Sequence, residues 1–508
     1  MLALAALDWV VMALYGAVVI GIGWYANRRQ KSSEDYFLGG RRLRWWVVGI
    51  SLIATSFSSA SLIGGTGFGF AVGMRWLQLQ IGDLVAIVVV CLVFLPFFST
   101  LGLTTAYEYL ERRFGVVART VASTLFILQT LLRSAVLIYG PALALSSVLG
   151  WEVNTAIVVA AAAAILYSTF GGIAAVVWTD LIQFAVILFA VGYCVLLVAG
   201  DVPGGFGSVM YHADSRGALE IVTFDADPGT PFNLLGTFVP YAVLAMSLFG
   251  TGQQAVQRFL SCRDLDSARR AAVTGWTAGT IALGVTLFLG VCIGVWAARA
   301  PGAMSTDGLK ADEVLPRFID ARLPAGVAGL MLAAIFAASM SSLDSAIHSM
   351  STAAVVDFFR RFSKRPPEAR MELRFAREMT LLFGLVATHG AIVAAQAQTT
   401  LLETLVTWLG YFAGPLLGLF LLGMLTRRAN EFGALVGTGV AILFVLALAW
   451  AWTGPESGTP YKPWGFHRLW FAPFSCALTI VLGFLASLLR PPPSKGQLHG
   501  LTRARISA

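Results

Sequence analysis

A serine-rich segment near residue 340 has the residue types and spacing of a site for a hard cation. It runs from Ala338 to Ser349 and reads ASMSSLDSAIHS. On a helix, positions 338, 341, 342 and 345 share one face, because their spacing follows the helical repeat. The face offers three hydroxyl oxygens and no positive charge, which suits a hard cation and not a thiolate-binding metal. Close packing of a serine-rich helix on its neighbour is the alternative.

Four titratable residues lie in otherwise apolar stretches, where charges are costly and usually functional. Asp344 and His348 stand four residues apart and either pair with each other or take part in proton coupling. Arg133 offers a bidentate partner for a substrate carboxylate or, alternatively, an internal ion pair with a protein carboxylate. Asp180, at the start of an apolar stretch, is either functional or a helix cap near the membrane interface.

Motifs for other chemistry are missing from the sequence. There is no GxxxxGKS/T phosphate loop and no HExxH zinc motif, and the glycine run at 64–69 does not follow a strand. The five cysteines form no CxxC pair and no metal-binding spacing with histidine, so they are expected to be core residues. We therefore expect no enzyme, no catalytic residues and no resident cofactor.

Membrane-spanning helices must position these groups. The 508 residues are 57% hydrophobic and 12% charged, whereas soluble domains average about 25% charged residues. Many apolar runs approach the length of about 20 residues that crosses a hydrocarbon core. We predict an all-α polytopic membrane protein with about thirteen transmembrane helices. The predicted spans are residues 8–27, 45–72, 79–98, 119–148, 154–172, 178–199, 233–257, 271–298, 324–357, 378–398, 402–426, 433–453 and 470–489.

The basic residues indicate how the chain is oriented. The net charge is +8, but 26 of the 35 Lys and Arg fall in alternate connections between spans and in the tail. By the positive-inside rule, this predicts an inner-membrane protein with its N-terminus outside and its C-terminus in the cytoplasm. The basic clusters are thus explained by topology, and no nucleic-acid partner is expected.

Two spans differ from the others in composition. The second contains six Ser and Thr followed by the run GGTGFG at 64–69, and the seventh contains GTGQQ at 250–254. Such clusters weaken a helix and free backbone carbonyls, which lipid tolerates only where they line a cavity. Each is the first span of a five-helix set, and interrupted helices in corresponding positions indicate a transporter built from inverted repeats. Ordinary helix packing through small residues is the alternative.

From about Trp24 to Arg428 the chain resembles the sodium–solute symporters. The motifs that carry the resemblance are DYFLGG at 35–40, GGI at 171–173, WTDLIQ at 178–183, QAVQRF at 254–259, SSLDS at 341–345 and GPLLG at 414–418. The resemblance implies a LeuT-like fold with inverted five-helix repeats. It also implies these parts: residues 1–44 with the first peripheral helix, 45–200 as the first repeat, 201–232 as an external loop, 233–428 as the second repeat, 429–490 with two peripheral spans, and 491–508 as a cytoplasmic tail.

The resemblance also implies ligands for sodium and substrate. The family's common sodium site would use the carbonyls of Ala54, Phe57 and Ala338 and the hydroxyls of Ser341 and Ser342. In the sialic-acid branch, Asp180, Ser341 and Ser345 match a second sodium site, although Asp344 replaces another of its ligands. That branch holds the sugar acid at positions that match Ser56, Ser58, Ser61, Gln80 and Arg133. Two of these positions are Ser where Thr is expected, so another carboxylate is also compatible with the sequence.

These observations lead to the hypothesis of a sodium-coupled symporter that imports a small organic carboxylate such as sialic acid. Sodium is the co-transported ion and the lipid bilayer is the surrounding partner. The alternatives are a sodium symporter for a monocarboxylate, a sugar or another organic anion, and a transporter-like membrane sensor.

Overall fold

The fold is known from a computed structural model that describes residues 4–27, 38–168, 173–225, 227–229, 233–299, 304–306, 308–365, 367–396, 401–452 and 465–502. Within these residues the chain is helical, and extended pairing is limited to one isolated bridge between Leu43 and Cys262. Of the family-like motifs, residues 35–37 and 171–172 lie outside the described residues.

Each of the thirteen predicted spans coincides with a helix or a run of helices. The bounds are α1 (Ala6–Asn27), α3 (Trp45–Ser56), α4 (Ser59–Val72), α5 (Leu79–Val89), η3 (Val90–Phe94), α6 (Leu95–Ser99), α8 (Val116–Leu149), α9 (Val153–Ser168), α10 (Ile173–Asp201), α12 (Leu234–Met246), η4 (Ser247–Thr251), α13 (Gln253–Leu260), α14 (Leu265–Arg299), α16 (Val327–Ala353), η6 (Ala354–Phe359), α18 (Ala369–Ala394), α19 (Leu401–Leu425), α20 (Glu431–Trp452) and α21 (Phe471–Ser487). Short helices connect them: η1 (Gly39–Arg41), η2 (Met74–Gln78), α7 (Glu108–Arg113), α11 (Gly205–Ser215), η5 (Ala311–Glu313), α15 (Val314–Arg322), α17 (Arg360–Phe362) and η8 (Arg468–Trp470).

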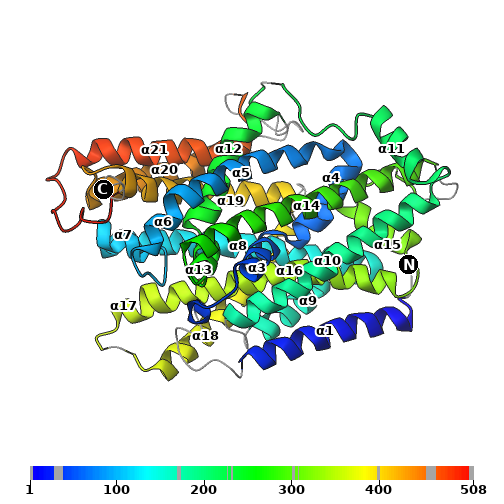
Figure 1. Cartoon of the computed structure of the whole chain (residues 1–508), viewed down its shortest axis with the longest axis horizontal. Helices are drawn as coiled ribbons and strands as arrows, with labels where there is room; N and C mark the ends of the chain where they lie inside the picture. Colours follow the sequence, from blue (N-terminus) through cyan, green and yellow to red (C-terminus); the bar gives the residue numbers. More distant parts are fainter. Residues whose placement is uncertain are drawn as a thin grey trace.

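The described helices have the length and hydropathy of a multi-pass membrane protein. Eight are long and apolar enough to cross a bilayer, and α3 with α4 makes a ninth if the bent pair is one span. Three shorter apolar helices lie in α1, α9 and the α12–η4 segment. The helices run side by side along the long axis, with the start of α1 at one end and the end of α21 at the other (Figure 1). This placement is the one expected for an odd number of crossings.

The second span is broken where its serines and glycines predict a break. α3 ends at Ser56, α4 begins at Ser59, and the two are bent by 67°. Phe57 has an extended backbone (φ −84°, ψ 101°), so the helical hydrogen bonds of α3 stop there. Ser58 then caps α4 through reciprocal hydrogen bonds with Ser61, a capping box that restarts the helix.

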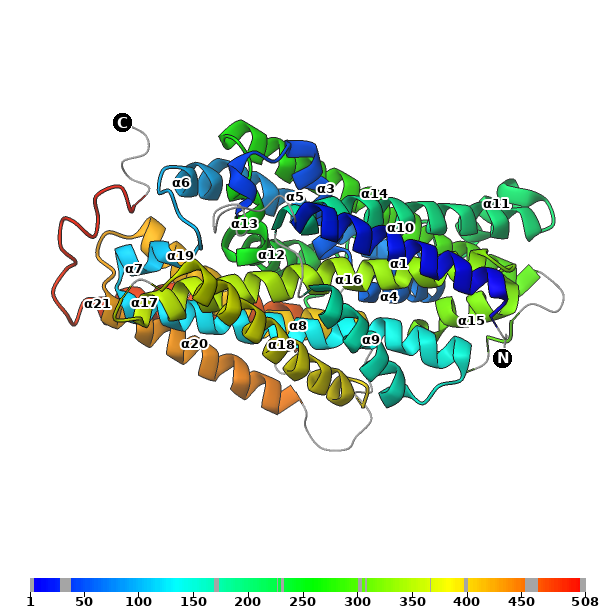
Figure 2. The same cartoon turned by 90° about the horizontal axis from the view of Figure 1, so that it is seen from below.

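The seventh span is interrupted too. α12 continues through the π-helical turn η4 to Gly252, whose backbone is extended (φ −69°, ψ 124°), before α13 begins. The first halves of the two broken spans have equivalent neighbours, because α3 packs on α14 and α12 packs on α5. The long helices α8 and α16 contact each other in the middle of the bundle (Figure 2). Both breaks therefore lie next to the packed centre of the protein.

Three of the basic residues in the predicted connections are buried within the protein. Arg113 and Arg258 are at most 1% exposed and Arg119 is 7% exposed. Arg113 lies in the connecting helix α7, Arg119 in the first turn of α8 and Arg258 in the last turn of α13. The seventh span was predicted to end at residue 257, whereas α13 continues to Leu260 and Arg258 lies inside the protein.

Candidate functional site

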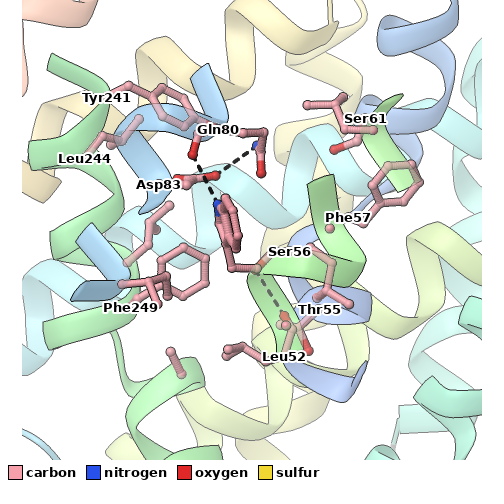
Figure 3. A pocket seen from close by; sticks show the side chains of 18 of the residues that line it. Leu52, Thr55, Ser56, Phe57, Ser61, Gln80, Asp83, Tyr241, Leu244 and Phe249 are labelled. Atoms are coloured by element: carbon pink, nitrogen blue, oxygen red, sulfur yellow. Dashed lines mark hydrogen bonds between the residues drawn. The ribbon is translucent and has the colours of Figure 1, made fainter. Parts of the chain in front are cut away.

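A cavity of about 140 Å³ lies beside the break between α3 and α4. Side chains from α5, α8, α12, α13, α14 and α19 complete its wall (Figure 3). Most of the lining is apolar or aromatic. The polar lining residues are Thr55, Ser56, Ser61, Gln80, Asp83, Arg133, Tyr241, Gln254 and Trp276. A mainly apolar cavity with a few convergent polar groups has the character of a small-molecule site.

Arg133 is the cationic group of this cavity. It is 6% exposed, and its guanidinium donates to the side-chain oxygen of Gln254 (2.8 Å) and to the carbonyl of Thr55 (2.7 Å). No carboxylate among the described residues pairs with it, so the internal ion pair considered from the sequence is not formed there. Its buried Nε and the buried Nε2 of Gln254 have no hydrogen-bond partner in the described residues. Both residues line the cavity, so two of its lining residues each have an unpartnered donor.

Four of the five predicted substrate residues line this cavity: Ser56, Ser61, Gln80 and Arg133. The Ser56 hydroxyl donates to the carbonyl of Leu52 (3.1 Å), which leaves its oxygen free to accept. Ser58 is different, because it is fully buried and its side chain belongs to the α4 capping box. Ser58 therefore does not line the cavity, but it is hydrogen-bonded to Ser61, which does.

The predicted sodium ligands on α3 and α16 converge. The Ser341 hydroxyl donates to the carbonyl of Ala54 (2.8 Å) and reaches the carbonyl of Ala338 (3.3 Å). The Ser342 hydroxyl lies 3.5 Å from the Ala54 oxygen. Phe57, the fifth predicted ligand, is the extended residue at the break, so its carbonyl points out of the α3 ladder. Hydroxyl and carbonyl oxygens of this kind suit a hard cation.

Asp180, predicted as a second cation ligand, lies in a buried polar network. It belongs to the second turn of α10 and is not a helix cap. Its Oδ2 accepts from the Ser51 hydroxyl (2.5 Å) and from Nη2 of Arg258 (3.1 Å), while its buried Oδ1 has no partner in the described residues. The same Arg258 nitrogen donates to Ser345 (2.5 Å), whose oxygen lies 2.9 Å from that of Thr55.

Two charged residues of the site were missed from the sequence. Arg258 stands within the QAVQRF motif, but it was assigned to a loop. Asp83 lies inside the third predicted span, where a lone carboxylate is itself a signal of function. Asp344 and His348, which the sequence did single out, are both buried in α16, at 3% and 6% exposure.

Comparison with known proteins agrees with this geometry. A model of the sodium:solute symporter family matches residues 36–440. The sodium/sialic acid symporter NanT of Aliivibrio fischeri is 32% identical, over 87% of both chains. The human sodium/iodide cotransporter is 30% identical, over 96% of this chain and 75% of its own. The solved structure of a substrate-bound, outward-open Na⁺-coupled sialic acid symporter superimposes with a TM-score of 0.84 at 27% identity, over 97% of this chain and 99% of its own.

Proposed function

Because the chain belongs to the sodium:solute symporter family and so couples solute transport across the membrane to sodium, we propose that its solute is a small organic carboxylate, with sialic acid as the first candidate. The protein is a LeuT-like, multi-pass membrane transporter and not an enzyme. The observation that carries the carboxylate proposal is Arg133, which lines the cavity and whose buried Nε has no hydrogen-bond partner in the described residues. A guanidinium in a mostly apolar wall favours an anionic partner that accepts two parallel hydrogen bonds.

In this proposal the substrate carboxylate binds Arg133 and Gln254, and its other polar groups reach Ser56, Ser61 and Gln80. Ser58 contributes by fixing the start of α4. Sodium binds the carbonyls of Ala54, Phe57 and Ala338 and the hydroxyls of Ser341 and Ser342. Since Thr55 lies between the two sites and its carbonyl accepts from Arg133, each site depends on the same broken helix.

Sodium entry supplies the driving force in this mechanism. Each positive charge that moves inward gains about 2.3 kcal/mol per 100 mV of membrane potential. The two ligands are reciprocally linked, so sodium tightens substrate binding by the same factor by which substrate tightens sodium binding. A rigid break at Phe57 and Ser58, shared by both sites, is a physical route for this linkage.

A second sodium at Asp180 and Ser345 is part of the proposal. Support comes from the unpartnered Oδ1 of Asp180. Arg258 already supplies a positive charge to the other carboxylate oxygen and to Ser345. We therefore propose that this sodium binds only when the guanidinium of Arg258 moves away from Ser345.

The proposed organisation follows the two broken spans. Residues 45–200 and 233–428 form two inverted repeats, residues 1–44 and 429–490 hold the peripheral spans, 201–232 is an external loop and 491–508 is a cytoplasmic tail. We place the N-terminus outside and the C-terminus in the cytoplasm. The equivalent packing of α3 on α14 and of α12 on α5 supports the repeat.

The test is uptake of labelled N-acetylneuraminate into proteoliposomes that contain the purified protein. We expect uptake with an inward sodium gradient, none with potassium in its place, and a loss of at least about tenfold in Arg133→Ala, because a charged hydrogen bond contributes about 1.5–3 kcal/mol. Arg75→Ala is the matched control, since Arg75 pairs with Glu220 outside the cavity. If uptake is sodium-dependent but Arg133→Ala transports like the parent, the carboxylate assignment is wrong.

A further inference from the structure

The cavity contains a carboxylate as well as a guanidinium. Asp83 follows Gln80 by one turn on α5 and is half-buried in the cavity wall. Figure 3 shows Gln80 and Asp83 side by side, between Tyr241 on one side and Ser61 on the other. Arg133 and Asp83 are the two charged residues of the lining in the described part of the chain.

Gln80 holds Asp83 in a defined orientation. The side-chain oxygen of Gln80 accepts from the Thr280 hydroxyl (3.0 Å), and Nε1 of Trp276 donates to its main-chain carbonyl (3.1 Å). The amide nitrogen of Gln80 is thereby directed to Oδ2 of Asp83 (3.0 Å). α14 thus fixes the side chain that positions Asp83.

The second carboxylate oxygen of Asp83 is available to a ligand. Among the described residues, the hydrogen bond from Gln80 is the contact made by this side chain, and no Lys or Arg there pairs with it. An ionised carboxylate accepts about four hydrogen bonds, so most of its capacity is unused. A substrate that excludes water without offering a donor would leave this group desolvated and unpaired, which is costly.

We propose that Asp83 determines specificity by accepting a hydrogen bond from the substrate. The transported carboxylates are then those that carry a donor (hydroxyl, amide N–H or ammonium) in addition to the carboxylate. Bare monocarboxylates and halide ions are rejected, because they satisfy Arg133 and leave Asp83 unpaired. The inference rests on the proposed function, since it takes Arg133 as the anchor of the carboxylate.

Matched ligand pairs test the inference on the full-length protein. Each pair differs in one donor: lactate against propionate, and phenylalanine against 3-phenylpropionate, with N-acetylneuraminate as the reference substrate. The measurement is inhibition of sodium-driven N-acetylneuraminate uptake, or sodium-dependent thermal stabilisation if that sugar is not carried. We expect the donor-bearing member of at least one pair to bind about tenfold more tightly, a preference that Asp83→Ala reduces to less than about threefold.

The variants separate the two kinds of donor. Asp83→Asn removes the charge but keeps an accepting oxygen, so it abolishes an ammonium preference and largely retains a hydroxyl preference. Asp266→Asn, at an exposed position on α14, is the control and should keep every preference. If Asp83→Ala does not fold, Asp83→Asn takes its place in the test.

The outcomes distinguish this inference from the proposed function. Equal binding within both pairs, or an unchanged preference in Asp83→Ala and in Asp83→Asn, overturns the role of Asp83 while carboxylate binding that depends on Arg133 stands. Absence of sodium-dependent binding for every carboxylate overturns the proposed function and this inference together.

Discussion

At the scale of single residues, Ser341 and Ser342 direct two hydroxyls at the carbonyl of Ala54. If these oxygens bind sodium, Ser341→Ala or Ser342→Ala raises the sodium concentration for half-maximal uptake by about tenfold or more, since a ligand to a charged group contributes about 1.5–3 kcal/mol. The measurement is the sodium dependence of uptake in proteoliposomes. Ser349→Ala is the matched control, because Ser349 is buried in the same helix but bonds only within it. A sodium dependence equal to that of the control would exclude the site.

Asp180 and Arg258 form a buried ion pair, each at most 1% exposed. Breaking such a pair from one side leaves an uncompensated charge and costs about 3–5 kcal/mol. We expect Asp180→Asn and Arg258→Gln each to lower the thermal midpoint of the purified protein strongly, and the double variant to recover part of the loss.

The double variant supplies the control for this prediction. If the decrease in its thermal midpoint equals the sum of the decreases in the two single variants, the residues act independently and the pair does not stabilise the fold. A sodium-induced rise in the midpoint that disappears specifically in Asp180→Asn would support the second sodium site.

At the scale of helices, the broken span depends on close contact between α4 and α14. A Cβ at Gly69 would lie 2.0 Å from the carbonyl oxygen of Leu287, and a Cβ at Gly290 would lie 2.0 Å from that of Thr66. Both glycines are therefore needed for the approach of the two backbones. Because Ser61 on α4 and Trp276 on α14 both line the cavity, this contact also sets the width of the cavity.

We expect Gly69→Ala and Gly290→Ala to force the helices apart, which costs about 1–3 kcal/mol and lowers the thermal midpoint. Gly284→Ala is the control on α14, because the nearest atoms to its added Cβ are side-chain carbons at 3.9 Å. Substrate affinity should fall with the first two variants and stay unchanged with the third. An unchanged midpoint in Gly69→Ala would show that the helices separate without loss.

At the scale of the whole molecule, the connections divide between the two ends of the bundle. α11 and α15 lie at the end where α1 begins, and α7 and α17 lie at the end where α21 finishes (Figure 1). The basic connections at 99–119 and 358–377 therefore share one end. This grouping supports a cytoplasmic location for that end by the positive-inside rule.

Labelling with a membrane-impermeant maleimide tests this orientation. Asp214→Cys, exposed on α11, should react in intact cells, whereas Lys364→Cys, exposed after α17, should react only after permeabilisation. The parent protein is the control, since four of its five cysteines are buried and Cys91 is partly buried. The opposite labelling pattern would reverse the proposed topology.

The sequence by itself determined the properties that depend on neighbours along the chain. Apolar runs of about 20 residues located the spans, because a segment crosses the hydrocarbon core only if it is long and apolar enough, and both properties are read from consecutive residues. The serines and glycines of the second span located its break, and the spacing within SSLDS placed Ser341 and Ser342 on one helix face. These features need no knowledge of which helices touch.

Only the tertiary structure decided which of the polar groups face one another. Arg258 looked like a loop cation until packing placed it against Asp180, 78 residues away. Asp83 acquired its significance from a cavity that also holds Arg133, on another helix. Ser58 proved to be a helix cap. The physical reason is that hydropathy averages over a window of one helix, whereas the pairing of buried charges is set by contacts between helices that are distant in sequence.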